Sequence, residues 1–498
     1  MMKRLLSVIP RVTSRDSAAA DSAYGLDRPL LLLSRHDPWR IRDACEGTAI
    51  FGATGSGKTS GSGAAIAKAF LRSEFGGLVL TAKPDERVSW QQYCAETGRS
   101  DSLRIISPEA PWRFNFLEYE ATRPGAGAGI TENLVGLFCN VLEVAERKNG
   151  SSSGQDYWQR TLRQLLRNAI DLLHTARGRV SLPELYQLIS SAPQCHDDLQ
   201  SERWQDQSLC FKCVAEGERK SKTAMASADF EMSARYWFDE FPNIADKTRS
   251  IIVSTFTSMC DGFLRGVLRE LFCTTTNIQP EQTLNGDILL VDLPVKEYSE
   301  VGQFAQVLTK YIWQRAVERR NVAENARPVF LWADEAQYFV TSSDMQFQST
   351  ARSSRAATVY LTQNLPSYYA ALGGGDRARS EADCLLGCLN SKIFHANGDS
   401  VTNNWAAELF SRSWQFRGSA STSSSSERGP FGNSPNQQVT AGGNQSLEYN
   451  VLPREFTTLR RGGPENDLIV EGIVFQGGRL WKATGGSQLY AQFSQKAT

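Results

Sequence analysis

No apolar run in the 498-residue sequence is long enough to cross a membrane. The longest apolar stretches, at 29–33 and 287–294, fall far short of the ~18–20 residues that a spanning helix requires. Residues 1–12 include basic and aliphatic side chains but lack the sustained apolar core and the cleavage site of a secretory signal. The sequence therefore predicts a cytoplasmic protein with no membrane span of its own.

An excess of charge of one sign is also missing. Lys and Arg total 54, Asp and Glu total 54, and the isoelectric point is near 6.9. This balance excludes a protein that coats a polyanion through bulk positive charge, so any contact with nucleic acid must be local. The ten cysteines are scattered and form no disulfide pattern, which favours reduced thiols.

Short apolar segments alternate with helical patterns in both halves of the chain. The first strands and helices follow one another in a βαβ rhythm, which is typical of a parallel sheet in an α/β protein. The predicted strands are 49–51, 77–81, 103–106, 287–293, 329–333, 358–362 and 391–396.

The middle of the sequence has a different pattern. Apolar residues recur at helical spacing through 125–247 and no strand is evident there, which predicts an inserted all-α domain. The α/β domain is then split between 26–124 and 248–498, after an N-terminal segment, 1–25. Within it, 416–446 is rich in Ser, Gly, Asn and Gln, and we expect a flexible loop.

A complete phosphate-binding loop stands between the first strand and a helix. In such a loop backbone N–H groups cradle phosphates, the Lys58 side chain reaches the β and γ phosphates, and the Thr59 hydroxyl ligates magnesium. The strand before and the helix after it argue against a chance glycine-rich turn. The predicted binding residues are Gly52, Ala53, Thr54, Gly55, Ser56, Gly57, Lys58, Thr59 and Ser60.

Two adjacent carboxylates end the apolar strand 329–333. A nucleotide hydrolase needs one carboxylate in the magnesium shell and one that activates water, and open α/β sheets bind ligands at the carboxyl ends of their strands. We assign Asp334 to the magnesium and Glu335 to the role of general base. Asp292 also ends an apolar strand but has no second carboxylate beside it.

Three polar residues near strand 358–362 are further candidates. Gln363 could sense the γ-phosphate or position water, or could simply satisfy the end of the strand. Arg352 and Arg355 precede the strand, where an arginine could reach its own nucleotide, reach a neighbouring subunit's nucleotide in a ring, or face solvent.

In their order these motifs resemble the ATPase core of type IV secretion coupling proteins. These are conjugative DNA-transfer ATPases of the TraG/TraD kind, within the FtsK/HerA translocase superfamily. The resemblance spans almost the whole chain from about Leu26. It rests on GATGSGKTS (52–60), LTAKPDE (80–86), RFNFLE (113–118), LWADEAQYF (331–339), ARSSRAATVYLTQN (351–364) and LGCLNSKIFHANGD (386–399).

The resemblance implies a RecA-like P-loop NTPase core interrupted by an all-α domain. It also implies a hexameric ring that hydrolyses ATP with Mg²⁺ between subunits and moves DNA, single-stranded or relaxase-bound, or protein substrates. Partners would be a relaxase or a secretion-channel ATPase, and a partner could recruit the chain to the inner membrane. The implied catalytic residues are Lys58, Glu335, Gln363 as the sensor glutamine, and Arg352 as the trans-acting arginine.

Two departures from the family keep alternatives open. The family usually begins with membrane helices, and none is evident here, so a cytosolic DNA motor for genome processing or plasmid or phage defence is the second hypothesis. A nucleotide-gated adaptor is a third, against which Glu335 argues. The second-strand motif reads AKPDE where the family usually has Lys-Gly-Glu, so Lys83 and Glu86 are candidates only.

Two patterns in the inserted domain favour structural roles over functional ones. Arg160, Arg163 and Arg167 recur at helical spacing, yet 125–247 carries 14 basic and 17 acidic residues, which favours a solvated helix face over a DNA-binding stripe. Four residues could supply zinc ligands, but adjacent Cys and His would have to splay apart to reach one ion. They are Cys195, His196, Cys210 and Cys213.

Overall fold

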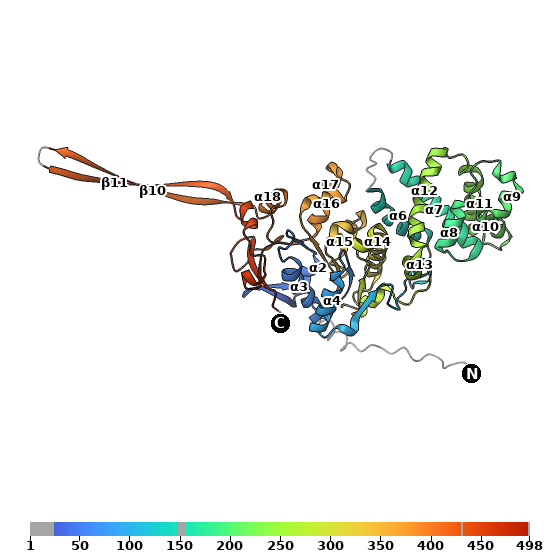
Figure 1. Cartoon of the computed structure of the whole chain (residues 1–498), viewed down its shortest axis with the longest axis horizontal. Coiled ribbons are helices and arrows are strands. Elements are labelled where there is room, and N and C mark those ends of the chain that lie inside the picture. Colours follow the sequence, from blue (N-terminus) through green and yellow to red (C-terminus); the bar gives the residue numbers. More distant parts are fainter. Residues whose placement is uncertain (1–23, 148–154, 430–431, 497–498) are drawn as a thin grey trace, which may run out of the picture.

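A nine-stranded sheet forms the centre of the molecule, in the order β13-β12-β9-β3-β8-β7-β4-β6-β5 (Figure 1). The structure, a computed structural model, describes residues 24–147, 155–429 and 432–496. Each predicted strand lies in this sheet. The strands are β3 (Thr48–Phe51), β4 (Gly76–Leu80), β5 (Leu103–Ile106), β6 (Ile288–Val291), β7 (Val329–Ala333), β8 (Ala356–Thr362), β9 (Ser391–Phe394), β12 (Ile469–Gln476) and β13 (Gln488–Ser494).

The predicted mostly parallel α/β sheet is confirmed. Seven neighbouring strands, from β9 to β5, run parallel, and only β12 and β13 at one edge are antiparallel. Every residue of β3, β4, β6, β7, β8 and β9 is buried, as expected when helices cover both faces of a parallel sheet.

In the seven parallel strands, alternate residues point into two different cores. One core contains aromatic side chains of α3 (Ala64–Arg72) and α4 (Asp85–Glu96), with Trp90 against Phe330 of β7. The other contains the apolar face of α14 (Val295–Arg319), which packs on α15 (Ser342–Thr350). Further strands and helices around this sheet are β1 (Pro29–Ser34), β2 (Asp37–Arg40), α2 (Ile41–Cys45), α5 (Phe116–Thr122), α16 (Leu365–Ala371), α17 (Gly375–Cys388) and α18 (Ser400–Leu409).

Between β5 and β6 the chain forms a group of helices at one end of the molecule (Figure 1). In the described part of 131–272 no strand is present. The region continues beyond the predicted end at 247, because α12 spans that position and packs on α7 and α8. Its helices are α6 (Thr131–Arg147), α7 (Gln155–Arg177), α8 (Leu182–Ser190), α9 (Glu202–Gln207), α10 (Leu209–Arg219), α11 (Ala224–Arg235), α12 (Asp246–Phe263) and α13 (Gly266–Phe272).

No single helix among the described residues is long and apolar enough to cross a membrane. Only α12 and α13 taken together satisfy the length and composition of a span, and they are bent by 84° at their junction. Both helices bury apolar side chains in the helical region, including Phe256 and Leu271.

The prediction of a loop over 416–446 is wrong for the secondary structure of that segment. β10 (Arg412–Gly429) and β11 (Gly432–Tyr449) pair in register from Arg412↔Tyr449 to Gly429↔Gly432. The hairpin extends away from the sheet, opposite the helical region (Figure 1). A polar composition argues against a core of its own, but two strands can still satisfy each other's backbone groups.

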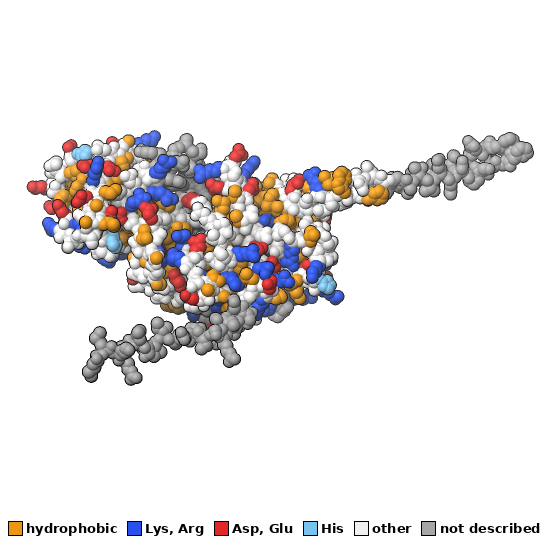
Figure 2. Space-filling model, turned by 180° about the vertical axis from the view of Figure 1, so that it is seen from behind, with side chains coloured by type: hydrophobic (Ala, Val, Ile, Leu, Met, Phe, Trp, Pro, Cys, Tyr) orange, Lys and Arg blue, Asp and Glu red, His pale blue; other side chains and the backbone are white. Residues whose placement is uncertain are grey.

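The surface agrees with the balanced composition. Acidic and basic side chains are interspersed over the face seen in Figure 2. Hydrophobic side chains gather near the base of the hairpin, where Trp414, Phe416 and Leu447 are exposed (Figure 2).

Candidate active site

The phosphate-binding loop follows β3 and leads through one turn (Thr59–Gly63) into α3. Gly55 and Gly57 have φ angles of +72° and +82°, the left-handed region that glycine adopts without strain. A Cβ on Gly57 would also lie 2.5 Å from Val470 of β12, so any larger residue would force the loop away from the sheet. The sequence thus builds a loop whose backbone stays accessible.

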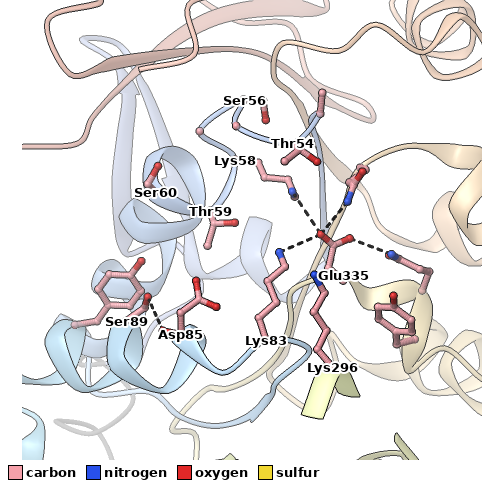
Figure 3. Close-up of a pocket in the computed structure, with 17 residues that line it drawn as sticks. Thr54, Ser56, Lys58, Thr59, Ser60, Lys83, Asp85, Ser89, Lys296 and Glu335 are labelled. Atoms are coloured by element: carbon pink, nitrogen blue, oxygen red, sulfur yellow. Dashed lines mark hydrogen bonds and ion pairs between the residues drawn. The ribbon is translucent and has the colours of Figure 1, made fainter. Parts of the chain in front are cut away.

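The loop borders a cavity of about 460 Å³. Residues from four further parts of the chain face it: α4 and the turn before it, the start of α14, the segment after β7 and the segment after β8 (Figure 3). The lining residues are Ala53, Thr54, Gly55, Ser56, Gly57, Lys58, Thr59, Ser60, Lys83, Asp85, Ser89, Tyr93, Lys296, Glu335, Gln337, Tyr338 and Gln363.

Thr59 and Asp334 meet beside this cavity although 275 positions separate them. The Thr59 hydroxyl donates to Asp334 Oδ2 over 2.7 Å, and Asp334 Oδ1 accepts the backbone N–H of Glu335 over 2.9 Å. Asp334 is almost fully buried at the end of β7. A hydroxyl and a carboxylate at this distance are the hard oxygen ligands that Mg²⁺ prefers, so the two residues fit a magnesium site.

Asp292, the rival magnesium ligand, lies outside the set of residues that line the cavity. Its carboxylate accepts from Arg87 over 2.8 Å, and burial raises its pKa while the Arg87 hydrogen bond and charge lower it. The ion pair with Arg87 gives Asp292 a structural role.

Glu335 stands at the centre of the polar contacts in the cavity (Figure 3). Its Oε1 lies 3.1 Å from Lys83 Nζ and 3.9 Å from Lys58 Nζ, and it accepts from Gln363 Nε2 over 3.2 Å. Its Oε2 accepts from Gln337 Nε2 over 3.0 Å. Both oxygens are therefore held in fixed directions.

Opposing effects set the pKa of Glu335. Burial raises this pKa, but the Gln337 hydrogen bond, the charge of Lys58 and the contacts of Gln363 and Lys83 lower it. The net pKa lies below the usual range, so the carboxylate is ionised at neutral pH and is able to accept a proton.

Gln337 is a site residue that the sequence reasoning missed. Its side chain accepts from the Thr362 hydroxyl over 3.0 Å while it donates to Glu335, so it joins the ends of β7 and β8. The available signal was its position two residues after the acidic pair, inside the motif LWADEAQYF.

The two second-strand candidates have different positions. Lys83 faces the cavity and pairs with Glu335. Burial lowers the pKa of Lys83, but the charges of Asp334 and Glu335 raise it overall. Glu86 lies outside the lining set and accepts the backbone N–H groups of Ala82 and Lys83, so it holds the turn that presents Lys83.

Arg352 and Arg355 lie just before β8. They are therefore at the amino ends of the parallel strands, whereas the phosphate loop follows the carboxyl end of β3. β8 has seven residues, which span roughly 20 Å, more than an arginine side chain can bridge. Arg352 is half-exposed and pairs with Glu46 over 3.1 Å. Arg355 donates to the backbone carbonyl of Tyr24 over 2.7 Å and so anchors the start of the described chain.

The two patterns in the helical region do not assemble a site. Cys210 and Cys213 are buried in the core of α10, whereas Cys195 is exposed and His196 contacts Asn243. Among the described residues no three potential ligands gather around a metal position. The arginines of α7, Arg160, Arg163 and Arg167, are exposed, and Arg167 pairs with Glu132.

His395 contacts the turn that follows the phosphate loop. It is fully buried directly after β9, and its Nδ1 lies 2.7 Å from the carbonyl oxygen of Glu471. Because that carbonyl can only accept, Nδ1 carries the proton, and Nε2 accepts from the Ser62 hydroxyl over 2.6 Å. The imidazole therefore ties the turn after the loop to β12.

The burial of His395 leads to a prediction on stability. Burial lowers its pKa to about 4, and the charge of Lys58 acts in the same direction, whereas the hydrogen bond to Glu471 raises it. In the unfolded chain His395 takes a proton near its ordinary pKa of 6.5. The contribution of the neutral His395 to the free energy of unfolding is therefore fully present above this pH. It is lost below it, by about 2 kcal/mol between about pH 7.5 and about pH 5.

We expect His395→Gln to reduce this pH dependence, because glutamine does not titrate. The check is urea unfolding of the wild type and the variant at both pH values, with the exposed His36→Gln as control. An identical loss of stability in the wild type and His395→Gln would refute the assignment of a neutral buried imidazole.

Comparisons with known proteins agree with this geometry at the level of fold. Neither a family model nor a curated protein sequence matches the sequence. Among solved structures, the unbound bacterial conjugative coupling protein TrwBΔN70 is similar with a TM-score of 0.56 at 15% identity, covering 97% of this chain and 92% of that chain. Plasmid coupling protein TrwB with a non-hydrolysable ATP analogue has a TM-score of 0.55 at 16% identity, covering 100% and 95%.

TrwB in complex with ADP and Mg²⁺ is also similar, with a TM-score of 0.55 at 16% identity and coverage of 93% and 88%. The expected RecA-like α/β core with an all-α region is thereby confirmed. Over nearly its whole length, this chain has the fold of the conjugative coupling protein TrwB.

Proposed function

We propose that this protein is a Mg²⁺-dependent ATPase that uses hydrolysis to move DNA, in the manner of a conjugative coupling protein. The observation that carries the proposal is the contact of Thr59 with Asp334 beside a cavity that also holds Lys58 and Glu335. A phosphate loop and an acidic pair from distant parts of the sequence thus meet at one place. The similar TrwB structures contain an ATP analogue or ADP and Mg²⁺, which supports ATP and Mg²⁺ as ligands.

In this proposal each residue of the site has a step in hydrolysis. The backbone of the loop and Lys58 bind the β and γ phosphates, and Thr59 and Asp334 hold magnesium, which neutralises phosphate charge when bound. Glu335 accepts a proton from the attacking water, since its carboxylate is ionised and lies within 3.9 Å of Lys58.

The amide groups beside Glu335 orient it. Gln337 donates to Oε2 and Gln363 to Oε1, so each oxygen is held by one amide. The proposal also gives Gln363, which lines the cavity, the sensor role expected for it. Lys83 balances the charge of Glu335 before nucleotide binds.

Arg352 is proposed to act on the nucleotide of a neighbouring subunit. It is too far from its own cavity, and its side chain is 56% exposed. A ring, which we propose to be a hexamer, brings the exposed edge of one subunit to the cavity of the next, because heterologous contacts that close form rings.

The test of this function is the ATPase rate with and without DNA, together with the mass of the assembled protein. We expect single-stranded DNA to raise the rate severalfold and to favour a ring, with double-stranded DNA and heparin, a polyanion without bases, as controls. Stimulation by heparin equal to that by DNA, or no stimulation at all, would contradict a DNA motor. Stimulation by double-stranded DNA alone would favour genome processing over transfer of a single strand.

A further inference from the structure

Lys296 is a third lysine in the cavity, and neither sequence motif includes it. It is the second residue of α14, just after the strand β6 and the segment DLP. Its side chain points into the cavity from the side opposite the phosphate loop, toward Glu335 (Figure 3). It reaches the same space as Lys58 from a different element.

The three lysines differ in their partners. Lys58 and Lys83 both lie near the Glu335 carboxylate. For the ammonium group of Lys296, no hydrogen bond or ion pair is present within the described parts of the chain. A lysine that faces a phosphate-binding cavity without a carboxylate of its own is available to an anionic ligand.

The backbone of Lys296 is fixed to the site. Its N–H donates to the carbonyl oxygen of Ala82 over 3.1 Å, and Ala82 precedes Lys83 in the turn after β4. The positions of Lys83 and Lys296 are therefore linked through one backbone hydrogen bond.

A strained residue separates Lys296 from the rest of its helix. Ser299 has φ 51° and ψ −135°, a conformation that non-glycine residues rarely adopt, and it breaks α14 after one turn. Gly302 allows the break, because a Cβ there would lie 2.6 Å from the Leu293 carbonyl oxygen. Strain of this kind persists only where the surrounding structure enforces it, and here it orients the short turn that carries Lys296.

We propose that Lys296 binds the terminal phosphate of a nucleoside triphosphate and so distinguishes triphosphate from diphosphate. This inference rests on the proposed function, since it requires that the loop binds the nucleotide. Lys58 and the loop hold the phosphates from one side. Lys296 faces the cavity from the other side, and a terminal phosphate that extends from the loop toward it would gain its charge only in a triphosphate.

The experiment measures nucleotide binding by calorimetry on the full chain, with Mg²⁺ and either ADP or the non-hydrolysable β,γ-imido analogue of ATP. Lys296→Gln is expected to raise the Kd of the triphosphate analogue about tenfold and that of ADP less than about twofold. Lys296→Arg keeps the charge and is expected to retain most of the preference for the triphosphate. Lys482→Gln, at an exposed site outside the cavity, is the matched control.

The variant Lys58→Ala distinguishes a failure of the proposed function from a failure of the role given to Lys296. If it leaves the binding of both nucleotides intact, the proposed function itself fails. If Lys58→Ala weakens both but Lys296→Gln changes neither, or changes both equally, the role of Lys296 is refuted. A loss confined to the triphosphate analogue supports it.

Discussion

Glu335→Gln is expected to lower kcat by about 10²–10⁴-fold while nucleotide binding is retained. The amide has the shape of the carboxylate and its single oxygen can still accept from one of the two amides, Gln337 or Gln363, but it cannot take a proton from water. Lys58 and Lys83 lose their negative partner and become more available to phosphates, so the affinity for the triphosphate is expected to stay or to rise.

The measurement is a steady-state ATPase assay together with nucleotide binding by calorimetry. Glu324→Gln is a suitable control, because that glutamate is exposed and lies outside the cavity. Glu335 is not the general base if the glutamine variant keeps more than about a tenth of the wild-type kcat.

Arg352→Ala is expected to lower the kcat of the assembled ring by about 10³-fold, since a trans-acting arginine stabilises charge on the transferred phosphoryl group. Binding of nucleotide to a single subunit should not change, because Arg352 lies before the amino end of β8, whereas the cavity lies at its carboxyl end. Arg377→Ala serves as the control, with a side chain that is 79% exposed on α17.

Mixing two inactive variants tests whether Arg352 acts between subunits. In a ring of Arg352→Ala and Glu335→Gln subunits, some interfaces combine an intact Glu335 with an intact Arg352 from the neighbour. We expect activity to reappear on mixing, in proportion to the number of these interfaces. If Arg352 acted within its own subunit, both kinds of subunit would stay inactive, and the mixture would show no gain.

The sequence by itself was sufficient to predict the strands and the loop of the site. Apolar runs such as 329–333 are buried on both faces of the sheet. Asp334 and Glu335 directly follow this run. Carboxyl ends of parallel strands share one edge of a sheet, so residues at these ends were expected to meet the phosphate loop. The contact of Thr59 with Asp334 follows from this rule.

The segment 416–446 marks where composition misleads. Its few apolar residues predicted that it would not join a core, and the hairpin of β10 and β11 indeed extends away from the sheet. Composition does not report whether a segment finds a backbone partner within itself. That depends on the pairing of 412–429 with 432–449, which hydropathy does not encode.

What the sequence determined was the chemistry available at each strand end: a loop with Lys58, an acidic pair and an amide at Gln363. What only the tertiary structure decided was which further side chains reach the same space. Gln337, Lys83 and Lys296 face the cavity because of a turn, a buried glutamate and a strained serine that hold their backbones. The order β8-β7-β4-β6 brings these segments together, and strand order arises from packing over the whole chain rather than from any local pattern.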